Sequence, residues 1–98
     1  MIVTYKSKSL EKICNDVSKA IRKYGADIAQ KLYQRLNEIR AAINVELMIQ
    51  YHIGRCHRLE GNRLGQYSVD LVHPYRLIFT VSGDEVKIAE IVEITDYH

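Results

Sequence analysis

Residues 66–81 read QYSVDLVHPYRLIFTV, and this stretch decides the fold. Apolar side chains recur at every second position on both sides of the His73-Pro74 turn signal, which is the period of a β-strand. One face of the predicted strand pair is apolar and carries Tyr67, Val69, Leu71, Tyr75, Leu77, Phe79 and Val81. The opposite face carries Ser68, Asp70, Arg76 and Thr80. The stretch therefore predicts an antiparallel hairpin with one face for the core and one face left open for chemistry.

The same two-residue period extends outward from this hairpin, from Arg55 to the last residues of the chain. Turn signals at Gly61-Asn62 and at residues 82–84 (SGD) separate its strands. We therefore expect an antiparallel meander over the C-terminal half.

The N-terminal half has a helical period instead. Its first residues, 2–5, predict a short strand, and Ser9 offers an N-cap for the helix that follows. Apolar residues then recur at helical spacing in two stripes: Leu10, Ile13, Val17 and Ile21, followed by Ile28, Leu32, Leu36, Ile39 and Ile43. Gly25 separates the stripes and can adopt the left-handed conformation that ends a helix. We expect a helical hairpin, then an irregular loop over residues 44–54. Because helices and strands are segregated, the predicted fold class is α+β, with the hairpin on one sheet face.

Length and composition restrict the class of protein. The 98 residues are 47% hydrophobic and 27% charged, which fits a single globular domain spanning residues 1–98 and excludes a disordered chain. The longest stretch without a charged residue, 47–54, is far too short to cross a membrane. The first residues lack the apolar segment of a secretion signal, so we expect a cytoplasmic protein with Cys14 and Cys56 reduced.

Charge is distributed unevenly along the chain. Residues 1–40 contain nine Lys or Arg and four Asp or Glu, whereas residues 77–98 contain one and five. The cationic half can attract RNA phosphates or an acidic protein, although a solvated helix face has the same composition. Lys12, Lys19 and Arg22 are candidate contacts for a protein partner.

Histidines and arginines are the candidates for chemistry. His57 lies among cations on the predicted first strand after the loop, although a lone strand histidine is more often structural. Arg76 is predicted on the open face, where it can bind a phosphate or form an ion pair with Asp70, and Arg63 can supply a second guanidinium. Cys56 and His57 point to opposite strand faces, which argues against a cysteine nucleophile. The spacing of the histidines and cysteines matches no zinc site, and we expect neither a metal nor a cofactor.

Four motifs carry a family resemblance: residues 57–63 (HRLEGNR), 65–69 (GQYSV), 75–79 (YRLIF) and 94–98 (ITDYH). With the order of a helical hairpin followed by a meander, they resemble the HigB-type proteic-killer toxins of the RelE/ParE superfamily. The resemblance implies a RelE-like fold and a toxin of a type II toxin-antitoxin system that cleaves messenger RNA on the ribosome. It also implies a cognate helix-turn-helix antitoxin of the HigA type.

The resemblance also implies roles for individual residues. The implied catalytic set is His57, Arg76, Asp96, Tyr97 and His98, and the implied RNA contacts are Arg63, Arg58 and Lys6. Which histidine is the base and which the acid stays open. The sequence departs from the family at Glu60, where relatives often have a lysine, so one phosphate contact is in doubt.

Cleavage by the RNA's own 2′-hydroxyl needs a base, an acid and cations around the phosphate, and these residues are of the right kinds. Two other functions stay open. One is a non-enzymatic topoisomerase poison, as in the ParE branch of the superfamily. The other is an RNA-binding module without turnover, which would use the basic helices and the aromatic rings of Tyr67 and Tyr97.

Overall fold

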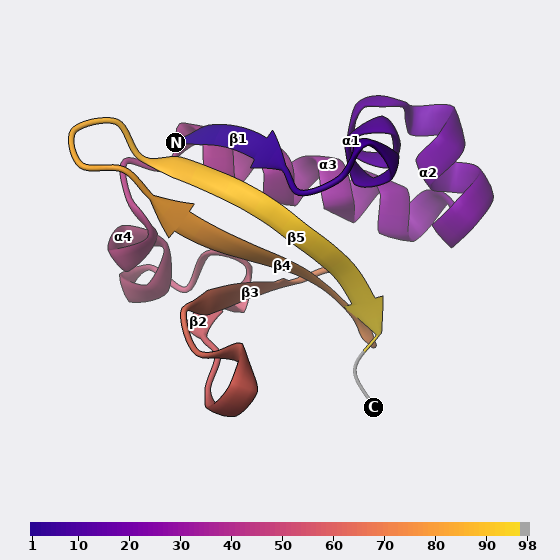
Figure 1. The fold of residues 1–98 in the computed structure, drawn as a ribbon. Coiled ribbons are helices and arrows are strands. Elements are labelled where there is room, and N and C mark those ends of the chain that lie inside the picture. The colour runs from indigo at the N-terminus through magenta and orange to yellow at the C-terminus, as the bar shows by residue number, and fades with distance from the viewer. Residues whose placement is uncertain (97–98) are drawn as a thin grey trace.

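The computed structural model describes residues 1–96 as a five-stranded sheet with helices packed on it (Figure 1). The strand order is β1-β5-β4-β3-β2. The strands are β1 (Ile2–Tyr5), β2 (His57–Arg58), β3 (Gln66–Asp70), β4 (Tyr75–Ser82) and β5 (Ile88–Asp96). The last four form the predicted antiparallel meander, and β1 joins the far edge parallel to β5. The α+β fold class is confirmed.

The helical half contains three helices where the apolar stripes predicted two. They are α1 (Lys8–Asn15), α2 (Val17–Tyr24) and α3 (Ala26–Ala41). The first stripe is interrupted at Asp16, whose extended backbone ends α1 while its carboxylate accepts a hydrogen bond from the Lys19 amide. Gly25, at a φ of 90°, ends α2 as predicted.

Two details of the predicted helices are wrong. The N-cap of α1 is Ser7, whose hydroxyl accepts the Leu10 amide at 3.1 Å, so Ser9 lies inside the helix. Three residues of the stripes are exposed rather than buried: Val17 at 54%, Ile21 at 42% and Ile43 at 76%. The break at Asp16 restarts the helical phase, and Ile43 lies beyond the end of α3.

The predicted loop over residues 44–54 is also wrong in part. It contains a short helix, α4 (Val45–Gln50), capped by the Asn44 side chain, and the 3₁₀ turn η1 (Ile53–Arg55) follows. Val45 and Met48 of α4 are buried in the core. Tyr51 and His52 connect α4 to η1, and Cys56 connects η1 to β2.

The core lies between the helices and one face of the sheet, where Val69, Leu77 and Phe79 are fully buried, together with Leu32 and Leu36 of α3. These strand residues are among those predicted for the core. Figure 1 shows α1, α2 and α3 gathered along β1 and β5, while β2 and β3 lie at the other edge. Within residues 1–96, no helix has both the length and the apolar character to span a membrane.

The face predicted to be open is partly covered. Ser68 and Ile78 alternate away from the core, yet they are only 0% and 2% exposed. The turn η2 (Gly61–Arg63) folds back toward this face, and Arg63 binds both Gln66 and Glu93 across it. The chain's own β2–β3 connection therefore occupies part of the surface that strand alternation left free.

Candidate functional site

A groove beside β2 collects most of the predicted site residues that the structure describes. Its volume is about 520 Å³, and it is lined by His57, Arg58, Leu59, Glu60, Asn62, Arg63 and Arg76. They come from β2, the connection between β2 and β3, and the start of β4. Residues nearly twenty positions apart in the sequence therefore converge here. We call this hollow the His57 groove.

The position of His57 is fixed by strand pairing and by one contact of its side chain. It pairs with Ser68 of β3, and its Nδ1 lies 2.9 Å from the Arg55 carbonyl oxygen. Because a carbonyl oxygen only accepts hydrogen bonds, Nδ1 must carry the proton in this contact. The neutral ring then has its lone pair on Nε2, which makes that atom the proton acceptor.

Arg63 enters the groove from η2 and is half-buried. One terminal nitrogen donates to Gln66 Oε1 at 2.9 Å, and the other forms an ion pair with Glu93. Glu93 was not predicted as a site residue. A β-bulge in β5 puts it on this face, because Ile78 pairs with Glu93 while the next residue, Phe79, pairs with Ile91. The three-residue spacing between Ile91 and Ile94 in an otherwise two-residue pattern is the sequence signal of that bulge.

Arg76 lies on β4, across from Asp70 on β3 and from Thr95 on β5. This is the open face that strand alternation predicted. The Asp70 carboxylate forms an ion pair with Arg55, with 2.6 Å between Arg55 Nε and Asp70 Oδ2. Sequence reasoning did not select Arg55, since it precedes the first regular strand and belongs to no motif.

The remaining predicted residues are Arg58, which also lines the groove, and residues that lie away from it or outside the described part of the chain. Arg58 stacks its guanidinium on the Tyr67 ring, 5.8 Å from the centroid. Lys6 is exposed just after β1, at the sheet edge opposite β2, so the structure does not bring it to the groove. Asp96 ends β5, paired with Tyr75. Tyr97 and His98 lie outside the described residues.

The cysteines are unsuited to nucleophilic chemistry. Burial raises the pKa of Cys56 to about 11 and that of Cys14 to about 12, so both thiols are protonated at neutral pH. Cys56 is buried while its neighbour His57, the first residue of β2, is only half-buried, as expected for successive residues in extended backbone. Within residues 1–96, no three His, Cys, Asp or Glu side chains cluster closely enough to hold a metal ion.

Ser68 is the one buried side chain of residues 1–96 whose hydrogen-bonding atom has no partner. It pairs with His57 on β2 and with Ile78 on β4, so it lies in the floor of the open face next to the groove. An unpaired buried hydroxyl costs folding free energy, and the sequence gives no sign of it.

Comparison with solved structures identifies the fold. A YoeB/ParE toxin from Agrobacterium tumefaciens superposes with a TM-score of 0.68 at 16% identity, covering 100% of both chains. The YoeB-YefM complex and the YoeB dimer from Staphylococcus aureus give TM-scores of 0.65 and 0.64 at 23% and 22% identity, each covering 100% of this chain and 97% of the other. No protein-family model and no curated protein matches the sequence. At these identities the likeness is one of fold, and the chain has the fold of the YoeB/ParE toxins.

Proposed function

We propose that the chain is the toxin of a type II toxin-antitoxin system and a ribosome-dependent endoribonuclease that cleaves messenger RNA. The observation that carries the proposal is the His57 groove, where an imidazole held at Nδ1 by the Arg55 carbonyl oxygen lies among three arginines. The fold shared with YoeB toxins supports the class, and the motifs around His57 and Arg76 support the HigB type.

In the proposed reaction, His57 Nε2 removes the proton from a ribose 2′-hydroxyl. The 2′-oxygen attacks the adjacent phosphorus, the bond to the 5′-oxygen breaks, and that oxygen leaves with a proton from a general acid. The products are a 2′,3′-cyclic phosphate and a 5′-hydroxyl, and no metal or cofactor takes part. The other members of the catalytic set that the resemblance implies are then candidates for the remaining roles: Tyr97 or His98 as the acid, and Asp96 as the group that orients it, because an unperturbed carboxylate is a weak proton acceptor.

Cations are needed because negative charge accumulates on the phosphate oxygens in the transition state. Arg76 and Arg63 line the groove with His57 and are the candidates for this role. Arg63 is partly neutralised by Glu93, which fixes its guanidinium and lowers its net attraction for RNA. Glu60 also lines the groove, so the position where relatives often have a lysine contributes an acidic side chain here.

The proposed partners are the ribosome with its message and a cognate antitoxin. One of the similar solved structures is a complex of YoeB with YefM, which supports a protein partner for this chain as well. The motifs favour a helix-turn-helix antitoxin of the HigA type. We expect it to bind the helical half and silence the toxin, and we expect both proteins in the cytoplasm.

The test is primer extension on transcripts after brief induction without an antitoxin. We expect discrete cuts inside translated codons, absent from the same message when its start codon is removed. Arg76→Ala should abolish the cuts, while Arg76→Lys should retain a fraction, because lysine keeps the charge but not the planar two-pronged contact.

The alternative function is that of a topoisomerase poison, as in the ParE branch. One similar solved structure is described as a YoeB/ParE toxin, so the experiment must also distinguish this alternative. Intact transcripts together with DNA trapped in cleaved complexes would overturn the ribonuclease proposal.

A further inference from the structure

Arg76 lines two hollows, of which the His57 groove is only one. The second has a volume of about 130 Å³ and is lined by Arg55, Asp70, Leu71, His73, Pro74, Tyr75 and Arg76. We call it the Arg55 hollow. Since the two hollows share Arg76, they are neighbours on the same side of the sheet, and a ligand extended across the groove reaches the hollow next.

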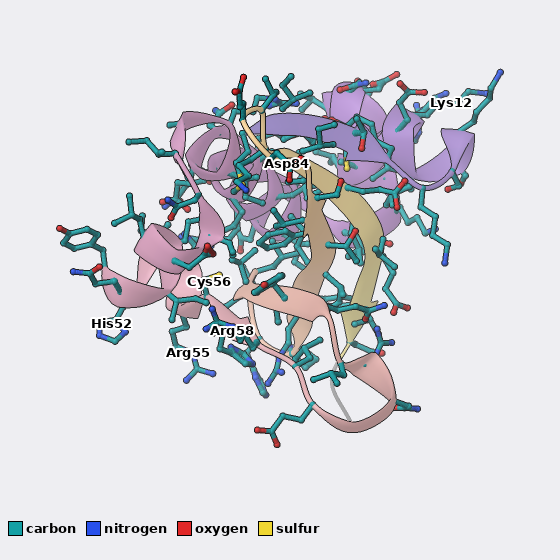
Figure 2. The ribbon with its side chains drawn as sticks, turned by 60° about the vertical axis from the view of Figure 1, so that its left-hand side comes forward. Lys12, His52, Arg55, Cys56, Arg58 and Asp84 are labelled. Carbon is teal, nitrogen blue, oxygen red and sulfur yellow. The ribbon has the colours of Figure 1, made fainter. Side chains whose placement is uncertain are left out.

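Arg55 is fixed at one atom and open at the others. Its Nε contacts Asp70 Oδ2 at 2.6 Å, yet 72% of its side chain is exposed. A guanidinium has five N–H donors, so this contact leaves the terminal nitrogens available to an incoming ligand. Figure 2 shows Arg55 projecting outward from the segment that also carries His52. Such an arginine is already oriented for a planar contact with phosphate oxygens.

The backbone that presents Arg55 is strained. His52 and Arg55 have φ values of 56° and 53°, in the left-handed region that non-glycine residues rarely adopt, and Gly54 between them is at 59°. Strain of this kind persists only where neighbouring contacts hold it, and it concentrates at functional sites.

The contacts that hold this segment come from α3. Arg35, whose side chain is 13% exposed, donates from Nε to the Asp70 carbonyl oxygen at 2.7 Å and forms an ion pair with Glu38. The same side chain lies under Gly54. Helix α3 thereby fixes both the Arg55 segment and the end of β3 that carries Asp70.

We propose that the Arg55 hollow binds a second phosphate of the RNA, the one adjacent along the backbone to the phosphate at His57. The proposal rests on the proposed ribonuclease function and adds a substrate contact to it. Arg55 and Arg76 supply two guanidinium groups. Asp70 fixes Arg55, of which 72% of the side chain stays exposed. An acidic protein segment could be attracted by the same charge, but the shared Arg76 and the continuity with the His57 groove favour a nucleic acid backbone.

The first experiment measures binding of a short RNA with 2′-deoxy substitutions, which the proposed reaction cannot cleave, over a series of salt concentrations. Arg55→Gln should weaken binding about tenfold, the effect of losing one charged hydrogen-bonding contact. It should also reduce the slope of log K against log salt by about 0.7, the value for one phosphate contact on a single strand. Arg55→Lys should recover part of the affinity. The matched control is Lys87→Gln in the β4–β5 connection, at the opposite end of β4 from Arg76, which removes one charge without effect.

The second experiment identifies the phosphate. Single methylphosphonate linkages, which are uncharged, are placed one at a time along the same oligonucleotide. The wild type should lose affinity at two adjacent positions, and Arg55→Gln should lose sensitivity at one of them only. Unchanged sensitivity at every position would overturn the proposal. So would equal effects of Arg55→Gln and Lys87→Gln, or an Arg55→Gln variant that loses affinity for hexaglutamate but not for RNA.

Message cleavage by the wild type separates the two proposals. If the wild-type protein cuts translated messages, and the Arg55→Gln variant binds RNA and cuts messages as the control variant does, only the phosphate site is overturned. If the wild type does not cut, the ribonuclease function fails, and with it the phosphate site that rests on it.

Discussion

The two faces of the same sheet differ in what they contribute. On the helix-covered face, Val69, Leu77 and Phe79 are fully buried and touch mainly carbon. On the opposite face, His57, Arg63 and Arg76 converge around a groove, and charged side chains meet across strands. Because strand residues alternate between the faces, one run of eight residues in β4 serves both. Stability and the proposed chemistry are therefore carried by neighbouring residues and can be separated by single substitutions.

His57→Gln should produce the largest effect on the groove face. The amide keeps hydrogen-bonding capacity but cannot accept a proton at neutral pH, so message cleavage should fall about 10²- to 10⁴-fold. The free energy of unfolding should change little, because His57 is only half-buried. Cleavage is measured on ribosome-bound message at matched concentrations of folded protein. His52→Gln is the control and should cut normally; wild-type cutting by His57→Gln would remove this imidazole from the mechanism.

Phe79→Ala should produce the largest effect on the core face. Phe79 is fully buried and stacks on Tyr67 with 5.7 Å between ring centroids. Its truncation should lower the free energy of unfolding by about 3–5 kcal/mol, through lost burial and the cavity that remains. Denaturant unfolding followed by circular dichroism measures it.

Thr80→Ala is the matched control for Phe79→Ala, one position along β4 and on the other face. It should cost less than about 1 kcal/mol. Similar losses in both variants would contradict the division between the faces.

Ser68→Ala should produce the smallest effect, and it tests the part of the groove face that is buried. Since the Ser68 hydroxyl has no partner, its removal should raise the free energy of unfolding by up to about 1 kcal/mol. Cleavage should not change. A fall in cleavage with stability retained would instead show that this hydroxyl acts on His57 across the strand pair.

The fold could be predicted from the sequence where apolar residues recur with a single period. The alternation in residues 66–81 gave the hairpin and most of its core face correctly, since a register slip would expose the whole apolar set. Prediction failed where local hydrogen bonds decide the outcome. Ser7 and Ser9 are equally plausible caps in the sequence, and the break at Asp16 depends on a single side-chain contact.

Part of the lining of the candidate groove was named from the sequence. Motif residues His57, Arg58, Arg63 and Arg76 do line one groove. Arg55 and Glu93 were missed for different physical reasons. Glu93 reaches the groove face through a bulge that shifts the alternation, and Arg55 reaches its hollow through left-handed backbone that no L-residue favours. The backbone at Arg55 cannot be deduced from residue type and spacing, whereas the three-residue spacing between Ile91 and Ile94 does signal the bulge that brings Glu93 to this face.

The buried guanidinium of Arg35 restricts how this sequence can evolve. A Cβ at position 54 would lie 2.7 Å from Arg35 Nε, and Arg35 is held in place by the Asp70 carbonyl oxygen and Glu38. A side chain at position 54 is therefore tolerated only if position 35 shrinks, and a smaller residue at 35 releases the segment that presents Arg55. Arginine at 35 and glycine at 54 should be inherited together, so among divergent sequences of this fold the pair would mark those that keep the Arg55 hollow.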